Sequence, residues 1–454
     1  MSPPPPAYAQ QDAAYGAFPA FPVRHIETTG TRPGNRSGSL ALKLLIGPGM
    51  LAMLGENDGP SMLSYATTGA TYGIGFFLPF ILATFVAAYI VQEMAMRLGA
   101  ATGRGYGELV VQRFGRSWGW MSTIDLIATN FITLVTEVIA IRLGMGYFGV
   151  PAWGAALCAV ALVASTALGG RYRRWEGIVA GLAVFNLVFL AVACLSGAPS
   201  RGILVSVASW TPFPHAGLAT FFMLVASNIG ATVTPWMLFF QQSASVDKGL
   251  IGPDAIKTGR INTGFGAIVA ALCGAAALIA AYPLFVHHVD MSRFSDGLGF
   301  AQALRPFIGR TGGALFALGL IEAGAVAMLT VSASGAYAVG EMVQGKVASF
   351  NASLAQAPLF HAVNIGIAML ACVVVLIPGA PLMAIMLNAN LLATILMPSS
   401  LILLLILVND RAVMGRHVNG RLANVAGIGV CCAITLAALA ATVTGFVNAL
   451  GINL

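Results

Sequence analysis

The stretch GPGMLAMLGENDGPS, residues 47–61, decides how this chain is organised, because it places charged residues inside the first long apolar segment. Glu56 and Asp58 stand there with one asparagine between them, and Gly59 and Pro60 follow directly. A proline interrupts a helix and leaves nearby backbone carbonyls without intrahelical partners. A carboxylate inside a membrane costs about 2.5–3.5 kcal/mol on insertion scales, so it indicates a function by default.

This stretch has two interpretations. Backbone carbonyls, hydroxyls and a carboxylate at a helix break are the ligands that a hard cation prefers. The alternative is a proline kink whose carboxylate caps the following half-helix or pairs internally. We expect an ion site at Asp58 and keep the kink as the alternative.

The composition is that of a membrane protein. Of the 454 residues, 58% are hydrophobic and 9% are charged, and the mean hydropathy is +0.84. Soluble proteins carry about 25% charged residues, so this chain is predicted to be an all-α polytopic membrane protein in the cell membrane. The net charge of +7 does not indicate a nucleic-acid partner, because the basic residues cluster between apolar runs, where they set orientation.

Segments of about 20 apolar residues can cross a bilayer as helices. The sequence predicts eleven of them, at 42–66, 76–98, 118–148, 151–168, 177–195, 218–243, 261–286, 312–339, 363–377, 382–408 and 425–450. Residues 1–40 are rich in proline, glycine and alanine and are predicted to be a disordered cytoplasmic tail. Most of the 23 lysines and arginines fall on the side of the N-terminus when the spans alternate. This bias predicts a cytoplasmic N-terminus and an external C-terminus.

The chain carries a weak internal symmetry. The first predicted span breaks at Gly59-Pro60 and the sixth at Thr234-Pro235, five spans later. Two five-helix repeats of inverted topology have this spacing, and they place an ion site at the midplane between two discontinuous helices. We therefore predict a transporter domain at 41–454, with repeats at about 41–198 and 216–408 and an eleventh helix at about 422–450.

The sixth span is unusually polar. Its polar residues are Asn228, Thr232, Thr234, Gln241 and Gln242. They line either an oxygen-rich cavity or a helix–helix contact, where each hydrogen bond contributes only about 0.6–2 kcal/mol. Beside an interrupted first helix, the cavity is the better interpretation.

Five motifs at matching positions carry a resemblance to a known family. The chain has GPG at 47–49 and DGPS at 58–61, GATVTPW at 230–236, a Q…RLGAATG pattern at 92–103, and EVIA at 137–140. It thereby resembles the NRAMP divalent-metal transporters, whose corresponding motifs are GPG, DPGN, GATVMPH, Q…RLG.ATG and EVIG. The resemblance covers nearly the whole chain from residue 40 onward, and it implies a LeuT-type fold and metal-ion transport.

The resemblance also implies a set of metal contacts, in which the family uses Asp, Asn, Met, a polar residue on the tenth helix and two backbone carbonyls. Carried over, they become the side chains of Asp58, Ser61, Thr234 and Asn390 and the carbonyls of Gly55 and Ala231. Glu56, as a water ligand or merely a vestibule charge, and Asn228 are further candidates. The soft thioether, which favours transition metals, is replaced by Thr234.

These departures favour a particular ion. Mg²⁺ gives up its water reluctantly and is bound through one or two carboxylates. An enlarged, oxygen-only site around Asp58 fits a partly hydrated Mg²⁺, and in this the chain looks like the NRAMP-related magnesium transporter branch. A related plant branch associated with aluminium also has threonine in place of methionine, so Thr234 alone does not decide the ion.

The proton path of the family is also altered. Where proton-coupled members carry a His and an Asp, this chain has Trp236 and Leu134, and 361–377 contains no Arg or Lys. Glu137 remains, either as a structural group or as a proton carrier. We expect uncoupled transport driven by the membrane potential, which for a divalent ion supplies about 4.6 kcal/mol per 100 mV.

The leading hypothesis is therefore an uncoupled Mg²⁺ transporter with Mn²⁺ as a second candidate substrate, without cofactor and monomeric in the lipid bilayer. A proton-coupled Mn²⁺ symporter of the same family is the nearest alternative. An organic-solute transporter is disfavoured, because Asp58 would repel a substrate carboxylate. A non-transporting metal receptor is the alternative of another class. The sequence contains no catalytic motif, so an enzyme is not expected.

Overall fold

The computed structural model describes residues 46–167, 171–213, 218–290, 298–343 and 348–449. The predicted disordered tail at 1–40 lies outside these residues. Within the described ranges the regular structure is entirely helical, with no strand. The all-helical architecture predicted from the composition is confirmed.

The described residues of the first half form ten helical elements. They are α3 (Pro48–Gly55), α4 (Gly59–Tyr72), α5 (Phe77–Thr102), α6 (Tyr106–Phe114), α7 (Arg116–Tyr147), α8 (Ala152–Ala167), α9 (Tyr172–Ala183), η2 (Val184–Leu187), α10 (Val188–Leu195) and α11 (Ser200–Ser209).

The described residues of the second half form ten more. They are α12 (Leu218–Gly230), α13 (Pro235–Asp247), α14 (Pro253–Ala280), α15 (Tyr282–Val286), α16 (Leu298–Met342), α17 (Pro358–Val375), α18 (Leu382–Asn409), α19 (Arg411–Met414), η4 (Gly415–His417) and α20 (Arg421–Ala449).

Among the described residues, nine helical stretches are long and apolar enough to cross a membrane. Two of the eleven predicted spans fall short by this measure. One is α8, which has 16 residues, and the other is the interrupted pair α3 and α4. Both stand at predicted positions, and the count of eleven crossings stays a prediction.

The eighth predicted span differs most from the structure. Its helix, α16, begins at Leu298, well before the predicted start at residue 312, and is divided at Gly309, whose φ is +73°. Only a glycine adopts that backbone conformation without strain. The prediction missed this part because it follows hydropathy, whereas backbone hydrogen bonding extends helices into polar sequence such as Arg305 and Arg310.

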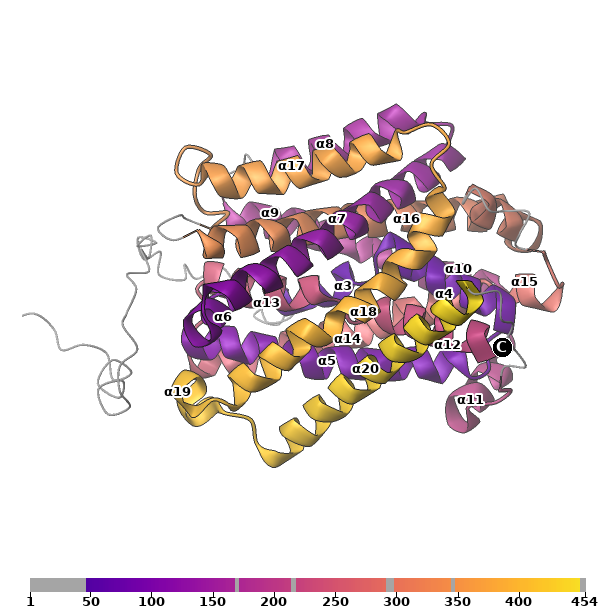
Figure 1. The fold of residues 1–454 in the computed structure, drawn as a ribbon. Helices are drawn as coiled ribbons and strands as arrows, with labels where there is room; N and C mark the ends of the chain where they lie inside the picture. The colour runs from indigo at the N-terminus through magenta and orange to yellow at the C-terminus, as the bar shows by residue number, and fades with distance from the viewer. Residues whose placement is uncertain (1–45, 168–170, 214–217, 291–297, 344–347, 450–454) are drawn as a thin grey trace, which may run out of the picture.

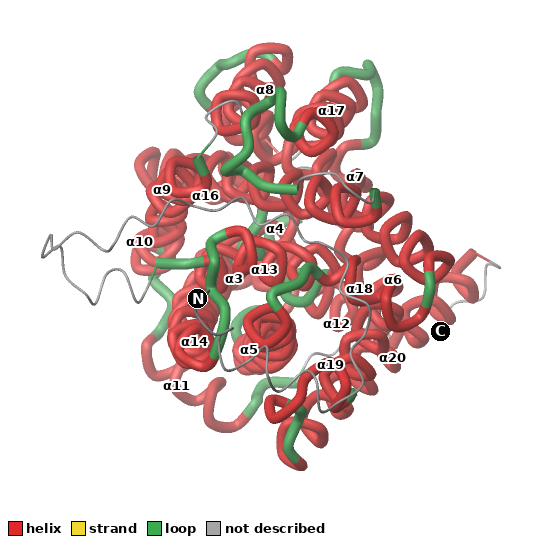
Figure 2. The backbone as a smooth tube through the Cα atoms, turned by 90° about the vertical axis from the view of Figure 1, so that its left-hand side faces the viewer, coloured by secondary structure: helices red, strands yellow, loops and turns green. Residues whose placement is uncertain are grey.

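The interrupted helices lie at the centre of the molecule. In both views α3, α4 and α13 are surrounded by the long helices, with α8 and α17 on one side and α19 and α20 on another (Figures 1 and 2). α7 packs along α16, and α5 packs along α14. This arrangement encloses both helix breaks.

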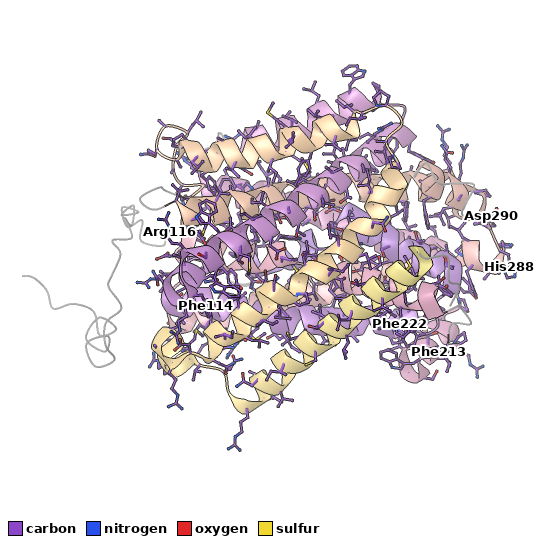
Figure 3. The ribbon with its side chains drawn as sticks, viewed as in Figure 1. Phe114, Arg116, Phe213, Phe222, His288 and Asp290 are labelled. Carbon is purple, nitrogen blue, oxygen red and sulfur yellow. The ribbon has the colours of Figure 1, made fainter. Side chains whose placement is uncertain are left out.

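The two ends of the helix bundle carry different elements. α6 and α19 lie at one end, whereas α11, α15 and the end of α20 lie at the other (Figure 1). Arg116 marks the first end, and His288 and Asp290 mark the second (Figure 3). The segments predicted to be cytoplasmic and external therefore fall at opposite ends, while the direction in which the molecule sits in the membrane stays a prediction.

Candidate metal site

The first break is a short unwound segment with a defined cap. α3 ends at Gly55 and α4 begins at Gly59. Asp58 is extended, and its Oδ1 accepts a hydrogen bond of 2.8 Å from the backbone N–H of Ser61. This contact satisfies a free N–H of the new half-helix and holds the Asp58 carboxylate at its N-terminus, where the helix dipole favours negative charge.

Neighbouring helices hold the rest of this break. The Asn57 side-chain amide donates to Asn186 Oδ1 at 3.1 Å and to the Ala270 carbonyl at 3.0 Å. Asn186 in turn donates to Glu322 Oε1 at 3.1 Å. The break is thus tied to η2, α14 and α16 by a buried chain of amides that ends on a carboxylate.

Glu137 of α7 also contacts the break. Its Oε2 accepts a hydrogen bond of 3.0 Å from the backbone N–H of Gly59. A Cβ on Gly59 would stand 2.1 Å from Ala140 Cβ, so only glycine allows α4 to approach α7 this closely. The Glu137 carboxylate therefore binds the N-terminus of α4, and it also lies close enough to interact electrostatically with Asp58.

The second break contains no charged residue. α12 ends at Gly230, and α13 begins at Pro235. The carbonyl of Ala231 accepts a hydrogen bond of 2.7 Å from the hydroxyl of Tyr65, which comes from α4. Thr234 Oγ1 donates to Glu56 Oε2 at 2.8 Å, so a hydroxyl of the second break contacts a carboxylate of the first.

The side chains at the two breaks are buried. The relative exposure is 0% for Glu56, 2% for Asp58 and 3% for Thr234. Several buried oxygens here have no hydrogen-bond partner: Glu56 Oε1, Asn57 Oδ1, Ser61 Oγ and Glu137 Oε1. Buried polar atoms are nearly always paired, with an ion or water where protein supplies no partner. The set consists of hard oxygen donors, which fits a hard cation as transported substrate.

Within the described ranges there is no group of three or more His, Cys, Asp or Glu side chains placed to hold a metal ion. A cation between the two breaks would therefore need neutral oxygens beside the carboxylates. Hydroxyls and backbone carbonyls at the breaks are groups of this kind, as in the half-helix sites of transporters.

The other predicted contacts lie around the breaks. A Cβ on Gly55 would meet Thr330 Oγ1 at 2.9 Å and the Trp236 ring at 3.0 Å, so this residue faces α16 and α13. Asn390 of α18 is buried, its backbone oxygen would stand 1.8 Å from a Cβ on Gly230, and its Nδ2 has no partner. The part these groups play in ion binding stays a prediction.

Asn228 is engaged in holding helices together. Its side-chain amide donates to Thr68 Oγ1 of α4 at 3.0 Å and to the Leu224 carbonyl at 2.8 Å. Ser64 and Ser227 join the same two helices, with their hydroxyl oxygens 3.1 Å apart. The polar residues of the sixth predicted span were expected to line either a cavity or a helix–helix contact. The hydrogen bonds of the Asn228 amide nitrogen are those of a helix–helix contact.

The two altered positions of the proton path are fully buried. Trp236 and Leu134 both have a relative exposure of 0%. An indole N–H is a donor only, and a leucine side chain exchanges no proton. Neither residue can pass a proton to Glu137.

Sequence reasoning missed three groups at this site: Tyr65, Asn186 and Glu322. Glu322 could have been found, because a carboxylate within an apolar segment indicates a function by the argument that singled out Glu56. Asn186 and Tyr65 gave no comparable signal, since an isolated amide or tyrosine is common in packed membrane helices.

Known proteins resemble the chain over most of its length. The model of the natural resistance-associated macrophage protein-like family, Nramp, matches residues 49–444. The divalent metal cation transporter MntH 1 of Pseudomonas aeruginosa is 25% identical over 414 residues, which are 86% of this chain and 89% of that protein.

Solved structures share the fold. A mutant of the manganese transporter of Eremococcus coleocola superposes with a TM-score of 0.75 at 22% identity, covering 94% of this chain and 92% of that one. MhsT in complex with L-phenylalanine gives a TM-score of 0.53 at 16% identity, covering 87% and 98%. The predicted LeuT-type fold is confirmed by these likenesses.

Proposed function

The chain belongs to the Nramp family, and we propose that it carries divalent metal cations across a membrane through the two helix breaks. The proposal is supported by the buried contact between Thr234 and Glu56, which joins the breaks and adds a second carboxylate beside Asp58. The related MntH proteins are named as divalent metal cation transporters, not enzymes, and their metal ion is a substrate and not a cofactor.

Mg²⁺ is the substrate that we propose first. Its preferred ligands are oxygens, with one or two carboxylates and several retained waters. Glu56 and Asp58 supply two carboxylates, and Ser61 and Thr234 supply hydroxyls. Thr234 stands where typical family members carry a methionine, so the thioether that favours softer metals is missing from this position.

Mn²⁺ is the second candidate. It also accepts carboxylate, carbonyl and water ligands, so an oxygen-only site does not reject it on chemical grounds. The relative of known structure from Eremococcus coleocola is called a manganese transporter. Discrimination between the two ions would depend on how much water the bound ion keeps.

We further propose that transport is not coupled to protons. Trp236 and Leu134 offer no titratable group, and Glu137 is engaged by the N–H of Gly59. The driving force would then be the ion gradient and the membrane potential, which supplies about 4.6 kcal/mol per 100 mV for a divalent ion. Such a carrier would work as a monomer in the cell membrane, with a cytoplasmic N-terminus and an external C-terminus.

Because the site is buried, transport requires movement of the half-helices. The outer half-helices α4 and α12 are joined by Ser64–Ser227 and Thr68–Asn228 hydrogen bonds. The inner half-helix α3 is held by Asn262 of α14, whose Oδ1 accepts from the Met50 N–H at 2.9 Å. Alternating access would break these two sets of contacts in turn.

The test is Mg²⁺ uptake into proteoliposomes that contain the purified protein and a pH dye, under an imposed potential. We expect Mg²⁺ entry that rises with the inside-negative potential and causes no acidification. Entry with acidification would overturn the uncoupled mechanism. Mn²⁺ flux without Mg²⁺ flux would favour the second candidate, and ion binding without any flux would favour a metal receptor.

A further inference from the structure

A second polar region lies away from the helix breaks, near the end of the molecule that carries α19. A cavity of about 440 Å³ opens there between α5, α14 and the segment that joins α19 to α20. Its polar lining includes Glu93, Arg97, Arg260, Arg416 and His417. None of these residues takes part in the proposed metal site.

The cavity has an excess of positive charge. Arg97 is buried and donates from Nε to Glu93 at 3.0 Å, and Arg260 donates from Nε to the same carboxylate at 2.9 Å. Arg416 is exposed and adds a third guanidinium group. One carboxylate therefore faces three arginines, and about two positive charges are left unbalanced.

Part of this charge is fixed in position and part is accessible. Arg97 also donates from Nη1 to the His417 carbonyl at 2.6 Å, which binds the α19–α20 connection to α5. The side chain of Arg260 is 51% exposed at the cavity rim. A guanidinium group offers five donors in a fixed fork that matches a phosphate, so one bond to Glu93 leaves Arg260 able to bind a second anion.

The same three arginines also affect the pKa of His417. It lies between α18 and α20, outside the membrane-spanning helices. Partial burial and the three neighbouring guanidinium groups lower the pKa of His417. His417 Nε2 accepts a hydrogen bond of 3.3 Å from Arg416 Nε, so these two cavity-lining side chains contact each other.

The remaining wall is apolar and continues along α20. Ile90 and Met94 of α5 line the cavity, and so does Leu422 of α20, which is 83% exposed. Val425 and Ile428 follow Leu422 on the same face of α20 and are 71% and 53% exposed. In a membrane-spanning helix, such a face contacts acyl chains.

We propose that this cavity binds an anionic phospholipid, with its phosphate at Arg260 and Arg416 and an acyl chain along the exposed face of α20. A cationic end beside an apolar stripe matches the two parts of such a lipid. Basic pockets between membrane helices on the cytoplasmic side bind acidic headgroups. The distribution of lysine and arginine assigns this end of the molecule to that side.

The test uses native mass spectrometry of the purified full-length protein titrated with phosphatidylglycerol or phosphatidylcholine. The variant is Arg260→Gln/Arg416→Gln, and the matched control is Arg116→Gln/Arg174→Gln, which removes two exposed arginines outside the cavity. We expect phosphatidylglycerol binding to fall about tenfold in the variant but not in the control. Phosphatidylcholine binding should stay unchanged. An equal loss in both would overturn the proposal, because the effect would then be one of net charge.

Two further measurements separate the remaining explanations. Ala423→Trp fills the apolar part of the cavity without changing charge, and Ala433→Trp places the same ring on an exposed position of α20 outside the cavity. Only Ala423→Trp should weaken phosphatidylglycerol binding, and equal binding by both would contradict the site. Displacement of the lipid by an equal concentration of glycerol 3-phosphate would also contradict it, because the acyl chain would then contribute nothing.

Discussion

The two helix breaks share a geometry and differ in chemistry. Each one interrupts a central helix, and each is followed by a half-helix with a proline in its first turn. The first break carries Glu56 and Asp58, whereas the second, from Ala231 to Thr234, carries no charge. The two openings in the backbone are therefore alike, and the side chains make only one of them acidic.

The breaks also differ in how they are held. The first is tied by Asn57 and by Glu137 to three neighbouring helices and η2 within the described structure. The second is held by hydroxyls, from Tyr65 at the Ala231 carbonyl and from Thr234 at Glu56. Both breaks are therefore held by buried hydrogen bonds, the first through an amide and a carboxylate and the second through hydroxyls.

The largest effect is expected from Asp58→Asn. Asparagine is as good a helix cap as aspartate, so the bond to the Ser61 N–H should survive. The loss of the carboxylate should reduce Mg²⁺ uptake about 100-fold, which corresponds to about 2.7 kcal/mol. Proteoliposome uptake measures this, with Asp254→Asn on an exposed turn of α14 as the control. If Asp58→Asn took up Mg²⁺ at the wild-type rate, the carboxylate of the first break would not be needed for transport.

Two substitutions of Glu137 distinguish a role in anchoring the first break from a role in proton transfer. Glu137→Ala leaves the buried N–H of Gly59 without a partner and should lower stability by about 1–3 kcal/mol. Glu137→Gln keeps an acceptor oxygen and should retain both the stability and Mg²⁺ uptake. Thermal unfolding in detergent and uptake assays measure the two properties. Loss of uptake in a stable Glu137→Gln protein would instead assign Glu137 to proton transfer.

Thr234→Met tests the neutral break. It introduces a thioether beside Glu56 and should shift the ratio of Mn²⁺ to Mg²⁺ uptake toward Mn²⁺ by about tenfold, or about 1.4 kcal/mol. Thr234→Val removes the hydroxyl without adding sulfur and serves as the control. A competition assay with both ions measures the ratio. An equal shift in both variants would mean that the lost hydroxyl, and not the sulfur, sets selectivity.

The smallest effect is expected from Tyr65→Phe. The change removes the hydroxyl that donates to the Ala231 carbonyl and lies 3.0 Å from Thr232 Oγ1. We expect a loss of about 1 kcal/mol of stability, since single hydrogen bonds between membrane helices contribute little. Thermal unfolding measures it, with Tyr72→Phe as the control farther along α4. A loss as large as that of Glu137→Ala would show that both breaks are held equally firmly.

Local sequence marked both breaks. Pro60 and Pro235 have no N–H to donate within a helix, and they stand beside the polar residues Glu56–Asp58 and Thr234. Proline alone does not decide the matter, because Pro398 lies inside the continuous helix α18. The apolar runs located the predicted spans, because hydropathy is also a property of local sequence. The prediction was less successful for α16, where Gly309 divides a helix that extends beyond its apolar part.

Contacts between distant segments could not be predicted from the chain. Nothing in the sequence near Asn57 indicates that Asn186 and Ala270 receive its amide, or that Glu137 binds the N–H of Gly59. The partners are separated by 78 to 213 residues along the chain. Such pairs depend on how the helices pack, and many packings are compatible with the same apolar pattern.

The sequence by itself determined that the chain is a membrane protein, because hydropathy acts locally, and its motifs carried the resemblance to the Nramp family and marked the two helix breaks. Only the tertiary structure decided that Thr234 contacts Glu56, that Asn228 joins two helices, and that three arginines gather beside an apolar face of α20. The physical reason is that a buried polar group must find its partner in space, and its neighbours in sequence do not specify that partner.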